Sequence, residues 1–261
     1  MSFSPEILVL FFFIALIAGT IDAIAGGGGL IMLPALLATG VAPSAAVATN
    51  KVGAVGGSFS AALHFICKGH VNIRALIPHI SCVFLGAVAG AVVVTFLSAH
   101  VLMLMIPFML IGFALFFLFS PNLGVTEAHA RLSAPLFIGL ICPLLGFYDG
   151  FCGPGTGTLM VVACVILQGF SMLKATATTK VLNATSNTAS LLFFVFQGQI
   201  FWDIGGVMLL GQFMGGNIGA RIAISKGQRL IRVLMVVVSI AMSIKLLLGY
   251  RLVAMVSHWM G

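Results

Sequence analysis

The chain has 261 residues, of which 61% are hydrophobic and 7% are charged, and its mean hydropathy is +1.23. This composition excludes an ordinary soluble domain and is typical of an integral membrane protein. The apolar runs are long and continuous rather than alternating, which favours helices over a barrel. A formal net charge of +7 does not indicate nucleic-acid binding, because the basic residues are scattered over short loops.

We therefore expect an all-α integral membrane protein with about 8–10 transmembrane segments. The second and seventh apolar segments have about 12 and 15 residues, whereas a span usually needs about 20. Both come directly after runs of glycine, so they are expected to be re-entrant half-helices or the second parts of broken helices. In chain order the ten apolar segments are residues 6–24, 28–39, 44–66, 75–97, 100–119, 133–149, 155–169, 173–197, 201–222 and 230–250.

One unusual pattern occurs twice. The strings AGTIDAIAGGGG and LGFYDGFCGPGT place Asp22 and Asp149 at an offset of 127 (149 − 22). Further along each copy, matching strings place Lys51 and Lys180 at an offset of 129 (180 − 51). Each copy thus puts an acid, a glycine run and a lysine inside strongly apolar sequence, which is typical of transporters built from repeats.

The duplication predicts two membrane repeats, residues 1–125 and 126–261, with five hydrophobic segments each. Five crossings is an odd number, so the two repeats are expected to be inverted relative to each other. If all ten segments cross, the loops richest in basic residues share one face, and the positive-inside rule makes that face cytoplasmic.

Asp22 and Asp149 each lie near the end of an apolar run, four residues before a glycine. Aspartate is a favoured helix cap and turn residue, so one interpretation is an acid that caps the next half-helix. The other interpretation is a carboxylate that couples transport to protons or acts as a gate, because ionisable groups at membrane depth are costly and usually functional. The two roles are compatible.

The glycine runs indicate a binding role. Glycine breaks a helix and lets backbone N–H groups approach a ligand, and a helix that begins there offers free donors and its positive dipole end to an anion. The alternative is close packing of helices, which we favour for Gly86, Gly90, Gly215 and Gly219. The candidate anion-binding residues in the runs are Gly26, Gly27, Gly28, Gly153, Gly155 and Thr156.

Lys51 and Lys180 lie too deep in their segments to reach the membrane surface easily. A lysine beside helix N-termini and amide side chains suits an oxyanion such as sulfite, a sulfonate or a carboxylate. The alternative is that Lys51 pairs with Asp149, or Lys180 with Asp22, only to hold the protein together. The other candidate substrate-binding residues are Thr49, Asn50, Thr179, Asn183 and Asn187, while Gln212 and Asn217 either extend the polar lining or hydrogen-bond across helices.

The strings GTIDAIAGGGGLIMLPALLATG and ATNKVGAVGGSFSA, with GFYDGFCGPGTGTLM and ATATTKVLNATSNTASLLFF, resemble the two signatures of the TauE/SafE sulfite-exporter family. This family is also called the toluene-sulfonate uptake permease group, and the chain is similar to its bacterial inner-membrane branch. The resemblance covers nearly the whole chain. It implies a duplicated, multi-pass helical transporter of the bacterial inner membrane for small sulfur-containing or other organic anions. The first copy departs from the second by having GGGGL in place of GPGTG and Ala54 in place of Asn183.

We expect a secondary transporter that moves a small anion, such as sulfite, a sulfonate, sulfoacetate or a carboxylate, by alternating access coupled to a proton or other ion gradient. Its partners are then the anionic solute and membrane lipid, without nucleic acid, either alone or as a homo-oligomer. We expect no enzyme activity, cofactor or metal. An anion channel is the nearest alternative. An intramembrane aspartyl protease, suggested by Tyr148-Asp149, is a more distant one.

Overall fold

The computed structural model describes residues 3–98, 100–102, 105 and 129–224. All regular elements in this part of the chain are helical, so the all-α fold class is confirmed. Four of its helices are long and apolar enough to cross a membrane: α1 (Pro5–Ala25), α4 (Ile73–Thr95), the helix Ala134–Phe151 and the helix Trp202–Ile224. The apolar segment 230–250, and nearly all of 100–119, lie outside the described residues.

Two of the expected helix breaks are present. Helix α1 ends where Gly26 adopts a left-handed φ of 81° and donates its N–H to Asp22 O at 2.7 Å. The short helix α2 (Gly28–Leu37) begins two residues later. The second break lies between α7 (Cys142–Phe151) and α8 (Thr156–Gln168), and glycines occupy its left-handed positions, with φ of 86° at Gly153 and 75° at Gly155.

The helices that begin after these breaks are short. With 10 and 13 residues, α2 and α8 extend about 15 and 20 Å. A hydrocarbon core is about 30 Å thick, so neither helix reaches across it alone. The prediction of two short helices after the glycine runs is confirmed.

The helix before the second break contains a feature that the sequence did not predict. Residues 134–151 form α6 (Ala134–Leu136), a π-helical turn η1 (Phe137–Ile141) and then α7. A π turn inserts one extra residue into the helix and rotates the residues after it, and such turns often occur near functional sites. Here it precedes the turn of helix that carries Asp149.

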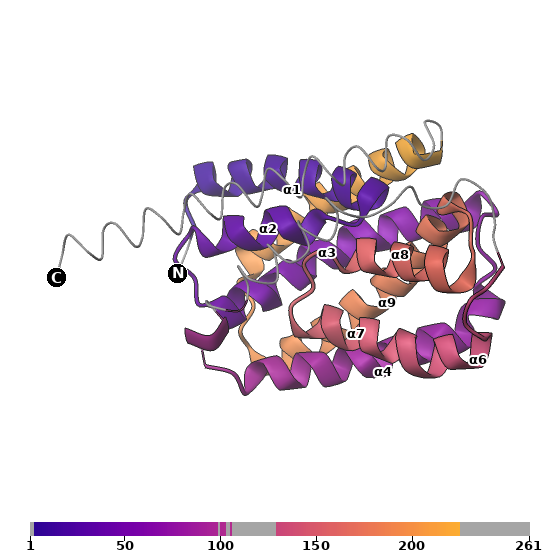
Figure 1. Ribbon diagram of the computed structural model, residues 1–261. Coiled ribbons are helices and arrows are strands. Elements are labelled where there is room, and N and C mark those ends of the chain that lie inside the picture. The colour runs from indigo at the N-terminus through magenta and orange to yellow at the C-terminus, as the bar shows by residue number, and fades with distance from the viewer. Residues whose placement is uncertain (1–2, 99, 103–104, 106–128, 225–261) are drawn as a thin grey trace, which may run out of the picture.

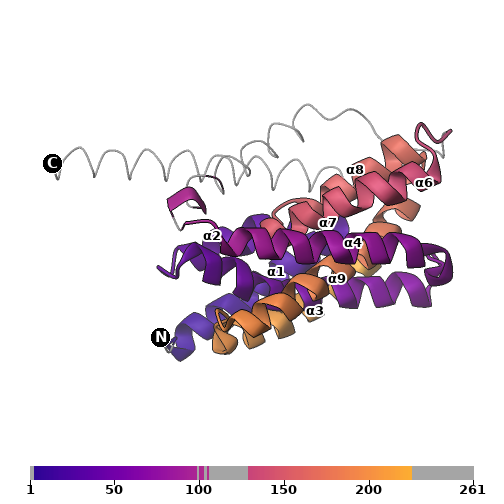
Figure 2. The ribbon, with the colours of Figure 1, turned by 90° about the horizontal axis from the view of Figure 1, so that it is seen from below.

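Helices α3 (Pro43–Cys67) and α9 (Met172–Gln197) run through the middle of the molecule and pack against each other (Figure 1, Figure 2). They are long enough to cross a membrane, but they are less apolar than the outer helices because they contain Thr, Asn, Ser and Lys side chains that are buried. The helices around them carry exposed large hydrophobic residues such as Phe13, Leu85 and Leu210. Polar groups are therefore inside and apolar groups outside, as expected for a protein surrounded by lipid.

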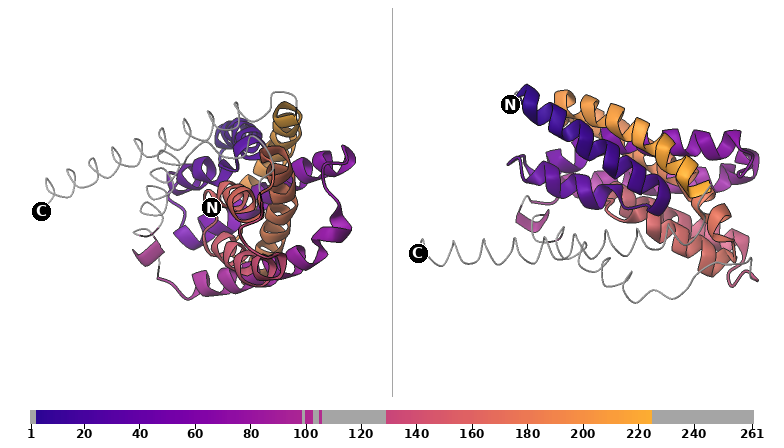
Figure 3. Two further views of the ribbon diagram at one scale, coloured as in Figure 1. Left: turned by 45° about the vertical axis from the view of Figure 1, so that its right-hand side comes forward. Right: turned by 90° about the horizontal axis from the view of Figure 1, so that it is seen from above.

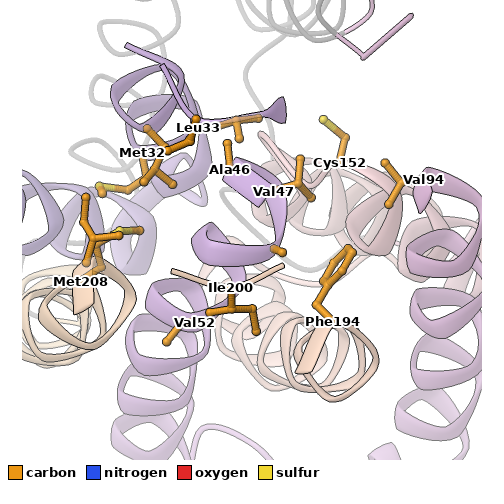
Figure 4. Packing of buried hydrophobic residues seen from close by; sticks show 14 of the residues in the cluster. Met32, Leu33, Ala46, Val47, Val52, Val94, Cys152, Phe194, Ile200 and Met208 are labelled. Atoms are coloured by element: carbon orange, nitrogen blue, oxygen red, sulfur yellow. The ribbon is translucent and has the colours of Figure 1, made fainter. Parts of the chain in front are cut away.

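The interior between these helices is filled by apolar side chains from both halves of the chain. Figure 4 shows Met32 and Leu33 of α2 together with Val47 of α3, Phe194 of α9 and Met208 of the helix Trp202–Ile224. Because these residues are far apart in the sequence, this cluster joins the first and last described segments into one core.

Glycines set the closest helix crossings. Helix α4 lies along α7, and the helix Trp202–Ile224 lies along α1 (Figure 3). A Cβ at Gly90 would overlap the carbonyl oxygen of Phe147, and one at Gly219 would overlap that of Thr20. Gly90 and Gly219 are 129 positions apart, and Thr20 and Phe147 are 127 apart, so the two crossings recur at the offsets of the sequence repeat. The packing interpretation of these glycines is confirmed.

We predict that Gly90→Ala destabilises the protein by about 1–3 kcal/mol, because the new methyl group has no space between α4 and α7. Gly206→Ala is the matched control, since a Cβ at that helical glycine meets nothing within 4 Å. Thermal unfolding of the purified proteins in detergent is the measurement. Equal melting temperatures for the two variants would contradict the close crossing.

Candidate functional site

The ammonium group of Lys51 lies in the centre of the molecule. Lys51, on α3, donates to Asp149 Oδ1 at 2.9 Å, to Asn187 Oδ1 at 3.0 Å, and to the main-chain oxygen of Asp149. An ammonium group has three N–H donors, and each has an acceptor here. Lys51 is therefore fully hydrogen-bonded within the protein in this conformation.

The second carboxylate oxygen of Asp149 is bound by α9. The hydroxyl of Ser186 donates to Oδ2, and Asn183 Nδ2 approaches the same oxygen at 3.5 Å. Asn187 Nδ2 in turn donates to Asn183 Oδ1 at 3.1 Å. These three α9 residues fall at helical spacing on one face. The predicted candidates Asn183 and Asn187 thus face the interior, where they and Ser186 orient the Lys51–Asp149 pair.

Lys180 of α9 forms the second pair. It donates to Asp22 Oδ2 at 3.0 Å and to the main-chain oxygen of Asp22. Asp22 Oδ1 accepts the N–H of Gly28, the first residue of α2, at 3.1 Å. Asp22 therefore caps the half-helix, as one interpretation of the sequence predicted, and binds a lysine as well.

The two pairs cross between the halves of the chain, since each lysine binds the aspartate of the other half. Both pairs weighed in the sequence analysis are thus present together. Their environments differ. The side chain of Asp149 is 2% exposed, whereas that of Asp22 is 15% exposed.

The difference between the pairs arises from the sequence of α3. At the offset of 129, the positions that match Asn183, Ser186 and Asn187 are Ala54, Gly57 and Ser58. The Ser58 hydroxyl donates to Ala54 O in its own helix at 2.6 Å. These three positions of α3 consequently offer Asp22 no counterpart of the α9 hydrogen bonds.

A small, partly open cavity of about 20 Å³ adjoins the Lys51–Asp149 pair. That volume holds about one water molecule. Its lining mixes charged, amide and glycine residues from both halves: Asp22, Gly26, Gly29, Asn50, Lys51, Ala54, Asp149, Gly153, Gly157, Asn183, Asn187 and Gln212.

The two glycine turns meet at this cavity. A Cβ on Gly157 would lie 2.6 Å from the Cα of Gly26, so the backbones touch there. One side chain ties the two turns together, because Thr158 Oγ1 donates to Ala25 O at 2.7 Å. The Tyr148 hydroxyl donates to Pro154 O at 2.6 Å and holds the second turn in shape. The N-terminal ends of α2 and α8, whose first N–H groups have no partner within their own helices, are thereby brought to one place.

The residues predicted from sequence fall into two groups. One group is not part of the cavity lining, namely Lys180, Thr49, Thr179, Gly27, Gly28, Gly155 and Thr156, and within it the Thr49 hydroxyl accepts the N–H of Phe201 at 3.1 Å. The other candidates line the cavity: Asp22, Gly26, Asn50, Lys51, Asp149, Gly153, Asn183 and Asn187.

Sequence reasoning missed Ser186 and left Gln212 undecided, whereas Gly29 and Gly157 belong to the predicted glycine runs without being among the candidates chosen from them. Ser186 lies three residues after Asn183, so helical spacing was the signal that pointed to it. Across the described ranges, His, Cys, Asp and Glu side chains form no group of three that could hold a metal ion.

Apolar outer helices, broken helices whose turns touch and buried charges around a small cavity are the features of a multi-pass membrane transporter. A family model for the sulfite exporter TauE/SafE matches residues 11–246. The chain therefore belongs to the TauE/SafE family, as the resemblance of its signatures predicted.

Three curated relatives are named as probable membrane transporters. A probable membrane transporter protein of Haemophilus influenzae is 45% identical over 246 residues, which are 94% of this chain and 96% of the relative. The probable membrane transporter protein YfcA of Escherichia coli K12 is 44% identical over 261 residues, with 99% and 96% covered. The probable membrane transporter protein ORF9 of a Sinorhizobium species is 44% identical over 242 residues, 93% of each chain. No solved structure matches the chain significantly.

We predict that the Lys51–Asp149 pair behaves as one unit in stability. Lys51→Met or Asp149→Asn alone leaves a buried charge uncompensated, which costs about 3–5 kcal/mol, whereas the double variant is closer to the wild-type protein. Thermal unfolding of the four proteins forms a double-mutant cycle. Additive losses would contradict a direct pair. The same cycle on Lys180 and Asp22 is expected to show a smaller coupling, because Asp22 is partly exposed.

Proposed function

We propose that the protein is a secondary transporter of the bacterial inner membrane that moves a small organic or sulfur-containing anion by alternating access, coupled to a proton or other ion gradient. The observation that carries this proposal is the pair of crossed lysine–aspartate contacts beside a small cavity at the junction of the two halves. The family membership supports it, while the substrate class and the coupling are our inference.

The saturation of Lys51 supports an exchange mechanism. Its three N–H groups already have acceptors, so an incoming anion gains the ammonium group only by displacing one of them. The carboxylate of Asp149 is the equivalent group, because a sulfonate or carboxylate offers the same kind of anionic oxygen. In the proposed cycle the anion therefore replaces Asp149 at Lys51.

This exchange links transport to protons. Once displaced, the Asp149 carboxylate is a buried charge without a counter-ion, and burial strongly disfavours that form. Uptake of one proton removes the charge, and its loss on the other side of the membrane restores the pair and releases the anion. Asp22 and Lys180 offer the same exchange in the other half, with an aspartate that is already partly exposed.

The closed junction of the glycine turns supports alternating access. The cavity holds about one water molecule in this conformation. Beside it the two halves of the chain touch, because the backbones of Gly26 and Gly157 are in contact. An anion channel needs a continuous polar path, whereas here the polar groups gather around a small cavity. Movement of one half against the other is then the way to open it.

We predict that anion uptake into proteoliposomes saturates with concentration and is accelerated by a proton gradient directed inward with the anion. The first panel is sulfite, alkyl sulfonates, sulfoacetate and short carboxylates. Lys51→Met and Lys180→Met are expected to abolish uptake, because binding an anion in an apolar interior without a counter-ion is strongly unfavourable. Uptake that rises linearly with concentration would indicate a channel instead.

Asp149→Asn separates binding from coupling. This variant keeps Lys51 as a counter-ion but lacks the group that takes up the proton, so anion exchange across the membrane is expected to persist while accumulation driven by a proton gradient is lost. Tracer exchange and gradient-driven uptake in the same vesicles are the two measurements. Undiminished gradient-driven accumulation would contradict the coupling role of Asp149.

A further inference from the structure

Two buried amide side chains on the cavity wall have unsatisfied hydrogen-bonding atoms. Gln212 of the helix Trp202–Ile224 is 3% exposed, and Asn50 of α3 is 4% exposed. Within the described part of the chain, Gln212 Nε2 and Asn50 Oδ1 have no hydrogen-bond partner. Both residues line the cavity beside Lys51 and Asp149. Leaving a buried donor and a buried acceptor unpaired is costly, so their retention calls for an explanation.

The surrounding helices are shaped to hold the Gln212 amide. A Cβ at Gly53 would lie 2.6 Å from Gln212 Nε2, and one at Gly57 would lie 3.2 Å from Oε1. Asn50, Gly53 and Gly57 are spaced by three and four residues along α3 and thus share one face of that helix. The two glycines leave the space that the amide occupies.

The other half of the chain fills the matching space with apolar atoms. At the offset of 129, Gln212 corresponds to Val83 and Gly53 to Leu182. Val83 and Leu182 are both buried in one hydrophobic cluster. Where α9 has Leu182, α3 thus has Gly53. Where α4 has Val83, the helix Trp202–Ile224 has Gln212. Simple packing needs no such exchange, because the apolar version serves the same crossing on the other side.

We infer that Gln212 and Asn50 are specificity-determining residues that contact the transported solute. Gln212 Nε2 donates a hydrogen bond to an anionic oxygen of the solute, and Asn50 Oδ1 accepts one from a hydrogen that the solute itself carries. The solute class is therefore a small oxyanion with its own donor, such as a hydroxyl, an amino group or an acid hydrogen. This inference rests on the proposed function and names the chemistry that the site selects.

The test compares ligands that differ by one hydroxyl group. Acetate and glycolate form one pair, and ethanesulfonate and 2-hydroxyethanesulfonate form another. Ligand-dependent shifts in melting temperature of the purified protein give the dissociation constants. We expect wild-type protein to bind the hydroxylated member roughly tenfold more tightly, since one hydrogen bond to a buried group is worth about that factor.

Three variants separate the roles. Gln212→Met keeps the volume and removes the donor, so it is expected to weaken both members of a ligand pair by roughly 10- to 100-fold, as for a hydrogen bond to a charged group. Asn50→Leu is expected to remove the preference for the hydroxylated member and to leave the other almost unchanged. Gly53→Ala displaces the Gln212 amide without removing it, and it is expected to weaken binding as Gln212→Met does, which covers the case that the latter variant does not fold.

Thr176→Val is the matched control. The Thr176 hydroxyl is also buried and lacks a partner among the described residues, but it does not line the cavity. Its loss is expected to leave every dissociation constant unchanged. If wild-type protein binds anions and Gln212→Met binds them equally well, the inference is wrong while the proposed function stands. If wild-type protein binds none of these anions, nor sulfite or sulfoacetate, the proposed function itself fails.

Discussion

The structure depends on one constraint, which is that a charge in an apolar interior must be neutralised by a nearby opposite charge. Lys51 and Lys180 lie on the two central helices, and each is neutralised by an aspartate of the other half of the chain. The crossing matters more than the number of pairs. Pairs within each half would stabilise two independent units, whereas these pairs hold the halves against each other.

The glycine turns arise from the same constraint. Asp22 and Asp149 lie in the last turns of α1 and α7, where both helices break, and a break exposes backbone groups that lipid cannot satisfy. Gly26 and Gly153 make these breaks compact, and the touching turns, the Asp22 cap on α2 and the Thr158 bond to Ala25 satisfy part of the exposed backbone. In the proposed transport cycle, a motion that opens the cavity disturbs the ion pairs and the turns together, and we infer that this links charge movement to access.

The sequence predicted the helices and their breaks, but not the closest contacts between them. Apolar run lengths located the described helices, and the glycine runs located both breaks, because these features are local. The lysine–aspartate pairs were weighed as an alternative, since spacing alone does not tell which of two deep lysines meets which acid. Ser186 and the π turn of residues 137–141 were missed. A serine in a helix is common, and a π turn adds a residue without a marked sequence signal. The inversion of the repeats and the division at residue 125 stay predictions.

Differences between the repeats give the two ion pairs different surroundings. A strict two-fold arrangement would surround both ion pairs with the same groups, and an anion would then meet two equal sites. Here α9 supplies Asn183, Ser186 and Asn187 to one pair, while α3 offers Ala54, Gly57 and Ser58 to the other. The glycines of α3 make room for Gln212 in the same region. The acids, the lysines and the crossing glycines occur in both copies, and they hold the helices together. The positions that differ between the copies surround one ion pair with amide side chains. Divergence between the copies therefore converts a symmetric charge network into a single polar site.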